Sequence, residues 1–137
     1  IIRRSAFFSE RNDKKYHTSS LSMEWMDQKM DRLTALMEKE KPFIKNNFSR
    51  SDLASQLSVS DHQLSQLINE KTDTNFFGLI NRYRTLEAKN LLDDPQNDHL
   101  TIEQIAYDVG YNSKSAFYTA FKKEFQITPH AYRKSKT

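Results

Sequence analysis

The clearest pattern of apolar and polar positions lies between residues 102 and 123. Four apolar residues recur there at three- and four-residue spacing, which predicts a short helix with one buried face: Ile102, Ile105, Ala106 and Val109. Gly110 follows, and glycine is common where a helix ends in the left-handed conformation. A second helix is predicted after a cap at Asn112 or Ser113, with Phe117 and Phe121 pointing inward. Two short helices joined by a tight turn form a helix-turn-helix.

The same pattern occurs once more, earlier in the chain. Ser49 or Ser51 can cap a helix, and Ser58 takes the position of the turn residue. Ser60 then caps a second helix, with Gln63 placed for a capping box. The apolar residues of the two helices are Leu53, Ala54, Leu57, Leu64, Leu67 and Ile68. The repeat is loose in residue identity but consistent in pattern, which favours two related motifs over two unrelated helix pairs.

Two longer amphipathic segments accompany these motifs. Residues 74–94 have apolar positions over about five turns, including Phe76 and Phe77, and predict one helix about 30 Å long with Thr74 as its cap. Residues 21–41 predict another helix, with Ser20 or Ser22 as its cap and a methionine-rich face. Such a face is typical of a core or of a contact with a partner helix. If the chain dimerises, this helix is the expected contact.

The sequence therefore predicts an all-α fold, with two helix-turn-helix subdomains joined by a long linker helix and preceded by an extra N-terminal helix. The expected division is a basic polar leader, the N-terminal helix, the first subdomain, the linker helix and the second subdomain, at residues 1–20, 21–42, 43–73, 74–94 and 95–137. The leader admits two interpretations. It is either a polar tail, or a juxtamembrane segment in which Ile1 and Ile2 end a membrane span and Arg3 and Arg4 follow it.

Composition excludes several classes of function. The chain has no cysteine, so it has neither disulfides nor thiolate metal ligands. Its four histidines are scattered without metal-ligand spacing, and no glycine-rich phosphate loop or nucleophile motif is present. We therefore expect no enzyme activity, no metal and no cofactor. The net charge of +3 is only mildly basic, and residues 50–94 carry seven acidic and five basic side chains.

Two groups of residues resemble the AraC/XylS family of transcription regulators. One is the segment from Ile105 to Tyr111, followed by Phe117, Phe121-Lys122-Lys123-Glu124-Phe125, Thr128-Pro129 and Tyr132-Arg133. The other comprises Leu53-Ala54, Val59-Ser60, Asn81-Arg82-Tyr83-Arg84, Ala88, Leu91 and Leu92. The resemblance covers about residues 45–135. It implies a bacterial DNA-binding domain whose two reading helices, joined by the long helix, enter adjacent major-groove segments of promoter DNA.

The resemblance also implies which residues contact DNA. Those at base-contacting positions are His62, Ser65, Gln66, Asn69, Lys114, Ser115, Tyr118 and Thr119. Those expected to contact phosphate are Ser60, Lys71, Arg82, Arg84, Ser113, Lys122 and Lys123, with Arg84 tied either to the DNA backbone or to the protein's own structure. Glutamine suits adenine, lysine suits guanine, and hydroxyls can bond several bases. Two residues depart from the family pattern: Gln126 stands in place of a usual glycine, and Thr119 in place of a frequent arginine.

The same resemblance suggests partners and location. Double-stranded promoter DNA is the expected ligand, and RNA polymerase and a second copy of the chain are candidate partners. Residues 15–43 resemble the leader of a subgroup with an N-terminal multi-span membrane sensor, so the chain is expected in the cytoplasm, as a free protein or as the cytoplasmic part of an inner-membrane protein. The alternative is a helical interaction or dimerisation domain without DNA binding. Packing of both reading helices' outer faces within the protein would favour that alternative.

Overall fold

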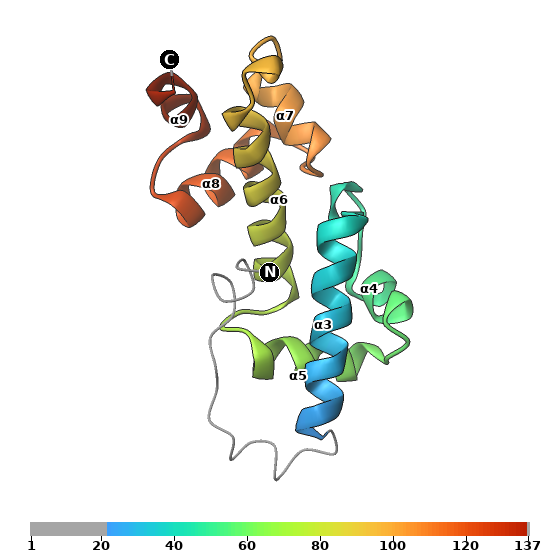
Figure 1. The fold of residues 1–137 in the computed structure, drawn as a ribbon. Helices are drawn as coiled ribbons and strands as arrows, with labels where there is room; N and C mark the ends of the chain where they lie inside the picture. The colour runs from blue at the N-terminus through green and yellow to red at the C-terminus, as the bar shows by residue number, and fades with distance from the viewer. Residues whose placement is uncertain (1–21, 137) are drawn as a thin grey trace. The chain divides into compact units, whose positions relative to one another are not determined.

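The computed structural model describes residues 22–136 and is all-helical over that range, as predicted (Figure 1). The predicted leader, residues 1–20, lies outside the described residues, so neither interpretation of it is tested. In chain order the elements are α3 (Met23–Lys39), η1 (Pro42–Ile44), α4 (Arg50–Gln56), α5 (Asp61–Lys71), α6 (Phe76–Asp93), η2 (Pro95–Asn97), α7 (Ile102–Asp108), α8 (Lys114–Phe125) and α9 (Pro129–Ser135).

The described residues form two compact units. The first unit contains residues 22–42 and 48–79, and the second contains residues 43–47 and 80–136. The long helix α6 therefore supplies residues to both units. The sequence pattern grouped residues 43–47 with the first helix-turn-helix, whereas their contacts place them in the second unit. It also set the N-terminal helix apart, whereas α3 belongs to the same unit as α4 and α5.

Helix α3 forms because its start is capped and one of its faces is buried. The Ser22 hydroxyl accepts a hydrogen bond from the Trp25 backbone N–H at 3.0 Å, which settles the choice between Ser20 and Ser22. Four residues of its apolar face are at most 1% exposed: Met26, Met30, Leu33 and Met37. This face packs within the first unit, where α3 contacts α5. The methionine-rich face is therefore core, and any dimer contact through α3 would have to use another face.

The start of α6 differs from the prediction in two ways. The Asn75 side-chain oxygen accepts a hydrogen bond from the Gly78 N–H at 3.0 Å, so Asn75 caps the helix and the predicted Thr74 cap is wrong. Phe76 is 6% exposed but Phe77 is 74% exposed. Consecutive helical residues point about 100° apart, so only one of the two rings can face this core. Phe76 therefore lies on the buried face as predicted, whereas the prediction for Phe77 is wrong.

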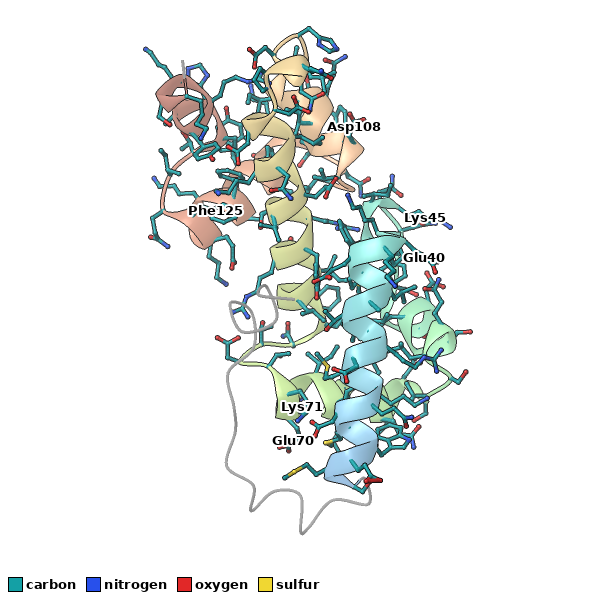
Figure 2. All side chains as sticks on the ribbon, viewed as in Figure 1. Glu40, Lys45, Glu70, Lys71, Asp108 and Phe125 are labelled. Carbon is teal, nitrogen blue, oxygen red and sulfur yellow. The ribbon has the colours of Figure 1, made fainter. Side chains whose placement is uncertain are left out.

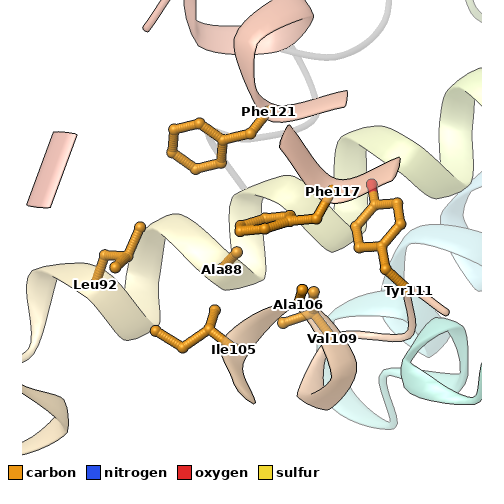
Figure 3. Close-up of a cluster of buried hydrophobic side chains, with 8 residues drawn as sticks. All are labelled: Ala88, Leu92, Ile105, Ala106, Val109, Tyr111, Phe117 and Phe121. Carbon is orange, nitrogen blue, oxygen red and sulfur yellow. The ribbon is translucent and has the colours of Figure 1, made fainter. Parts of the chain in front are cut away.

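The core of the second unit holds α7 and α8 against α6. Eight buried residues make up this cluster (Figure 3): Ala88, Leu92, Ile105, Ala106, Val109, Tyr111, Phe117 and Phe121. The rings of Phe117 and Phe121 meet edge to face with centroids 5.6 Å apart, an arrangement that aromatic quadrupoles favour. Because Phe117 and Phe121 are 0% exposed, they fix which face of α8 points outward.

Candidate nucleic-acid interface

The turn between α7 and α8 is built by two backbone hydrogen bonds around a left-handed residue. Gly110 has φ +113°. The Tyr111 N–H donates to the Ala106 carbonyl at 2.9 Å, and the Gly110 N–H donates to the Tyr107 carbonyl at 3.1 Å. Together these bonds form a Schellman motif, which satisfies the free carbonyls at the end of α7. The predicted role of Gly110 is confirmed.

The turn between α4 and α5 has the same construction. Ser58 has φ +58°, the Val59 N–H donates to the Ala54 carbonyl at 2.9 Å, and the Ser58 N–H donates to the Ser55 carbonyl at 3.1 Å. The repeat seen in the sequence is therefore a repeat of backbone geometry, with serine in one copy where the other has glycine. Each unit thus contains a helix-turn-helix of the same kind.

Side-chain caps set the start of both second helices. The Ser60 hydroxyl accepts from the Gln63 N–H at 3.1 Å, and the Gln63 side chain accepts from the Ser60 N–H at 2.9 Å, so the predicted capping box is present. The Ser113 hydroxyl accepts from the Ala116 N–H at 3.1 Å, so Ser113 rather than Asn112 caps α8. These caps fix where each helix begins, and hence which side chains its first turn presents.

Four predicted base-contacting residues lie at helical spacing along the outer face of α5. His62 and Asn69 are exposed, and Ser65 and Gln66 are half-buried. The start of α4 lies beside this face, because the Arg50 guanidinium donates to the Ser65 hydroxyl at 3.3 Å. Sequence reasoning did not identify Arg50, because a contact between residues 15 apart in different helices leaves no local pattern.

The other four predicted base-contacting residues lie on the outer face of α8. Lys114, Ser115 and Thr119 are exposed, and Tyr118 is half-buried. The Thr119 hydroxyl donates to the Ser115 carbonyl at 3.1 Å, and the Lys114 ammonium lies 5.5 Å from the centroid of the Tyr118 ring. This face therefore presents an ammonium, two hydroxyls and part of an aromatic ring from about one and a half turns of helix.

Six of the seven residues predicted to contact phosphate fall into two groups. Ser60, Ser113, Lys122 and Lys123 are exposed. Lys71, at the end of α5 (Figure 2), is ion-paired with Asp27, and the Arg82 guanidinium lies 3.5 Å from the Glu124 carboxylate. A phosphate would have to compete with these carboxylates for Lys71 or Arg82. The exposed lysines of α8 carry no such ion pair within residues 22–136.

Arg84 has a structural role within the second unit. Its Nε donates to the Phe43 carbonyl at 2.7 Å, and its Nη2 donates to the Lys45 carbonyl at 2.9 Å. The guanidinium carbon lies 5.5 Å from the centroid of the Tyr111 ring. Burial lowers the pKa of Arg84, and burial also raises the pKa of Tyr111, whose hydroxyl donates to the Asn81 side chain at 2.7 Å. Of the two roles that the resemblance allowed, the structure contains the structural one.

Gln126 ends α8 in the left-handed conformation, with φ +64° and ψ +21°. Residues other than glycine rarely adopt this backbone conformation. Glutamine in place of the family's usual glycine therefore puts backbone strain at position 126. The Gln126 amide partly offsets this by donating to the Lys123 carbonyl at 2.8 Å. The end of α8 therefore keeps the geometry that glycine would give it.

Two features are absent from the part of the chain that the structure describes. Between residues 22 and 136, no group of three or more histidine, aspartate or glutamate side chains is placed to hold a metal ion. No helix in that range is long and apolar enough to cross a membrane.

The chain is similar to known regulators in sequence and in structure. A family model described as a helix-turn-helix domain matches residues 53–135, more than half of the chain. The HTH-type transcriptional regulator GlxA of Rhizobium meliloti is 33% identical over 102 residues, which cover 74% of this chain and 31% of that protein. The chain spans about a fifth to a half of the length of several curated relatives that it matches.

Two solved structures have a similar fold. A transcriptional regulator from Chromobacterium violaceum, described as an AraC-type DNA-binding domain-containing protein, superposes with a TM-score of 0.70 at 25% identity and covers 81% of this chain and 94% of that one. The DNA-binding domain of AdpA, solved in complex with a target DNA, shares the fold with a TM-score of 0.63 at 20% identity, covering 77% and 90%. The chain belongs to the AraC/XylS family of transcription regulators and contains that family's helix-turn-helix DNA-binding domain.

Proposed function

We propose that residues 45–135 bind double-stranded promoter DNA sequence-specifically, with α5 and α8 each inserted into a major-groove segment. The observation that carries the proposal is the repeated unit: the same Schellman turn, followed by a capped helix with a polar outer face, occurs in both halves. A helix-turn-helix uses its second helix to reach base edges. The bound DNA of the AdpA domain, which has the same fold, supports this use of the fold.

The two helices would contribute differently to affinity. Helix α8 carries three lysines and one glutamate, whereas α5 carries two acidic residues and one lysine. Because cations that neutralise phosphates supply most of the sequence-independent affinity, α8 should dominate it. Helix α5 would act mainly through neutral hydrogen-bonding groups, with Gln66 suited to adenine.

The exposed outer faces argue against an interaction domain without DNA binding. That alternative would be favoured if both faces were buried in the protein's own packing. His62 on α5 and Ser115 and Thr119 on α8 are instead exposed. The polar faces are therefore accessible to a ligand in each unit.

Further partners follow from the same role. We propose that the chain acts in the bacterial cytoplasm, where promoter DNA is accessible, and that RNA polymerase contacts the bound regulator. A homodimer, and an upstream sensor domain that could be embedded in the membrane, would complete the whole regulator. The relatives are several-fold longer than their matched parts, which supports the proposal of an additional domain.

Selection from random double-stranded oligonucleotides tests the proposed function. We expect the chain to enrich a motif with two elements about one helical turn apart. Gln66→Ala should blur one element and Ser115→Ala the other, since each lost base contact costs about 1–3 kcal/mol. Ser55→Ala is the matched control, because Ser55 is an exposed serine on α4 rather than on a reading helix.

The outcomes separate the alternatives. Enrichment of one element, blurred only by Ser115→Ala, would mean that α8 reads sequence while the first unit contacts only the backbone. A chain that enriches nothing at low salt would contradict the proposed function and support an interaction domain. An effect of Ser55→Ala equal to that of Ser115→Ala would show that the variants act through folding.

A further inference from the structure

Two hydroxyls on the reading helices make hydrogen bonds within the protein, one as a donor and the other as an acceptor. On α8, the Thr119 hydroxyl lies 3.1 Å from the Ser115 carbonyl oxygen. A carbonyl oxygen can only accept, so Thr119 must donate its single hydrogen inward. What Thr119 presents outward is therefore its lone pairs and its methyl group, and Thr119 is exposed.

Ser65 on α5 is in the opposite state. The Arg50 Nη1 lies 3.3 Å from the Ser65 oxygen, and a guanidinium can only donate. Ser65 therefore accepts, and its own O–H remains available for another acceptor. Arg50 is exposed at the first position of α4. Within residues 22–136, its guanidinium interacts with the neutral Ser65 hydroxyl and with no carboxylate.

We propose that these two bonds fix the polarity with which each helix reads DNA: Thr119 accepts a hydrogen bond from a base amino group, and Ser65 donates one to a base acceptor. The inference rests on the proposed function. In the major groove the amino donors are N6 of adenine and N4 of cytosine. The acceptors are N7 of adenine, N7 and O6 of guanine and O4 of thymine.

Arg50 is then a positioning residue for base recognition by the first unit. A serine hydroxyl without a fixed partner rotates to suit either a donor or an acceptor. Ser115 is such a case, because its hydroxyl makes no hydrogen bond within the described part of the chain. Polarity is therefore fixed at the two constrained hydroxyls, whereas Ser115 can bond either a donor or an acceptor at the base edge that it reads.

Deleting single functional groups from the DNA tests the polarity. Duplexes carrying the selected motif are made with one major-groove group removed at a time. Purine in place of adenine and 2-pyrimidinone in place of cytosine remove the amino group. 7-Deazapurines remove N7, 2-aminopurine in place of guanine removes O6, and 5-methyl-2-pyrimidinone in place of thymine removes O4. Affinities are measured for the unchanged chain, for Thr119→Val, which keeps the side-chain shape, and for Ser65→Ala. Loss of one neutral hydrogen bond corresponds to about a 2- to 12-fold loss of affinity.

The expected result is a crossed pattern of non-additive effects. Removing the amino group at the Thr119 position should weaken DNA binding by the unchanged chain but cause no further loss in Thr119→Val. Removing the acceptor at the Ser65 position should weaken binding by the unchanged chain but cause no further loss in Ser65→Ala. Arg50→Met should relax the base preference at the Ser65 position while preserving the preference at the Thr119 position. Its thermal stability should stay within the error of the unchanged chain, which separates positioning from folding.

Several results would overturn the inference. Coupling of Thr119 to a base acceptor, coupling of Ser65 to a base amino group, or additive effects at every position would each show that polarity is not fixed in this way. Enrichment of thymine opposite Thr119 would show that the Thr119 methyl group recognises the base through an apolar contact with the thymine methyl group. An enriched motif with any of these patterns leaves the proposed function intact, whereas the absence of any enriched motif removes both.

Discussion

Gly110→Ala should destabilise the second unit by about 1.5–5.5 kcal/mol, although it adds only one methyl group. Gly110 has φ +113°, where an L side chain costs of order 1–3 kcal/mol. The added Cβ would lie 2.5 Å from the Phe43 carbonyl oxygen and 2.5 Å from the Arg84 Nε. These two atoms are joined by the 2.7 Å hydrogen bond that anchors η1, so this bond has to open.

The magnitude follows from those contacts. A hydrogen bond to a charged group contributes about 1.5–3 kcal/mol, and the lower entropy of unfolded alanine offsets about 0.4–1 kcal/mol. Urea unfolding followed by circular dichroism at 222 nm measures the free energy of unfolding by linear extrapolation. A loss below about 1 kcal/mol would refute the reasoning, since the smallest expected strain and hydrogen-bond loss together exceed the largest entropic offset by about 1.5 kcal/mol.

The equivalent position in the first unit gives a control of opposite sign. Ser58 has φ +58°, and glycine would remove a left-handed strain of about 1–2 kcal/mol at an entropic cost of about 0.4–1 kcal/mol. Ser58→Gly should therefore stabilise the chain by about 0.5–1 kcal/mol. Destabilisation by both substitutions would mean that the two turns are not equivalent.

Two other predictions concern charge. The Tyr132 hydroxyl, which donates to the exposed Asp93, holds the pKa of that carboxyl below its ordinary value of about 3.9. The stability that this lowered pKa provides is present above the ordinary pKa and is lost as the pH falls through the folded-state pKa. Between pH 6 and pH 2, the melting temperature should therefore fall less steeply for Asp93→Asn than for the unchanged chain. An equal slope for the two proteins would contradict this contribution of Asp93. Lys122→Gln should reduce the slope of log affinity against log salt concentration by about 0.9. Lys39→Gln removes the same charge from an exposed position of α3 and should leave this slope unchanged. Equal slopes for the unchanged chain and both variants would exclude a phosphate contact by Lys122.

Local chemistry explains why much of the fold could be predicted. The capping box at Ser60 involves residues three apart in sequence, so its pattern is visible without a structure. The turn at Gly110 and the inward pair Phe117 and Phe121 also depend on local spacing. Secondary structure and the outward faces of both reading helices follow from such patterns.

Tertiary contacts explain what was missed. Thr74 and Asn75 are both competent caps, and only the position of the Gly78 N–H decides between them. The assignment of residues 43–47 to the second unit depends on Arg84, which is about 40 residues away in sequence. The contact between Arg50 and Ser65 joins two helices, so no periodicity within either helix indicates it.

Contact between DNA and the outer faces of α5 and α8 can be observed residue by residue. Backbone amide chemical shifts of the isotope-labelled chain are recorded with and without the selected duplex. If both faces contact DNA, the largest shift changes fall at residues 60–70 and 113–123, while the exposed positions of α3 change little. Large changes confined to α3 and α9, with α5 and α8 unchanged, would show that DNA is not bound through the two reading helices.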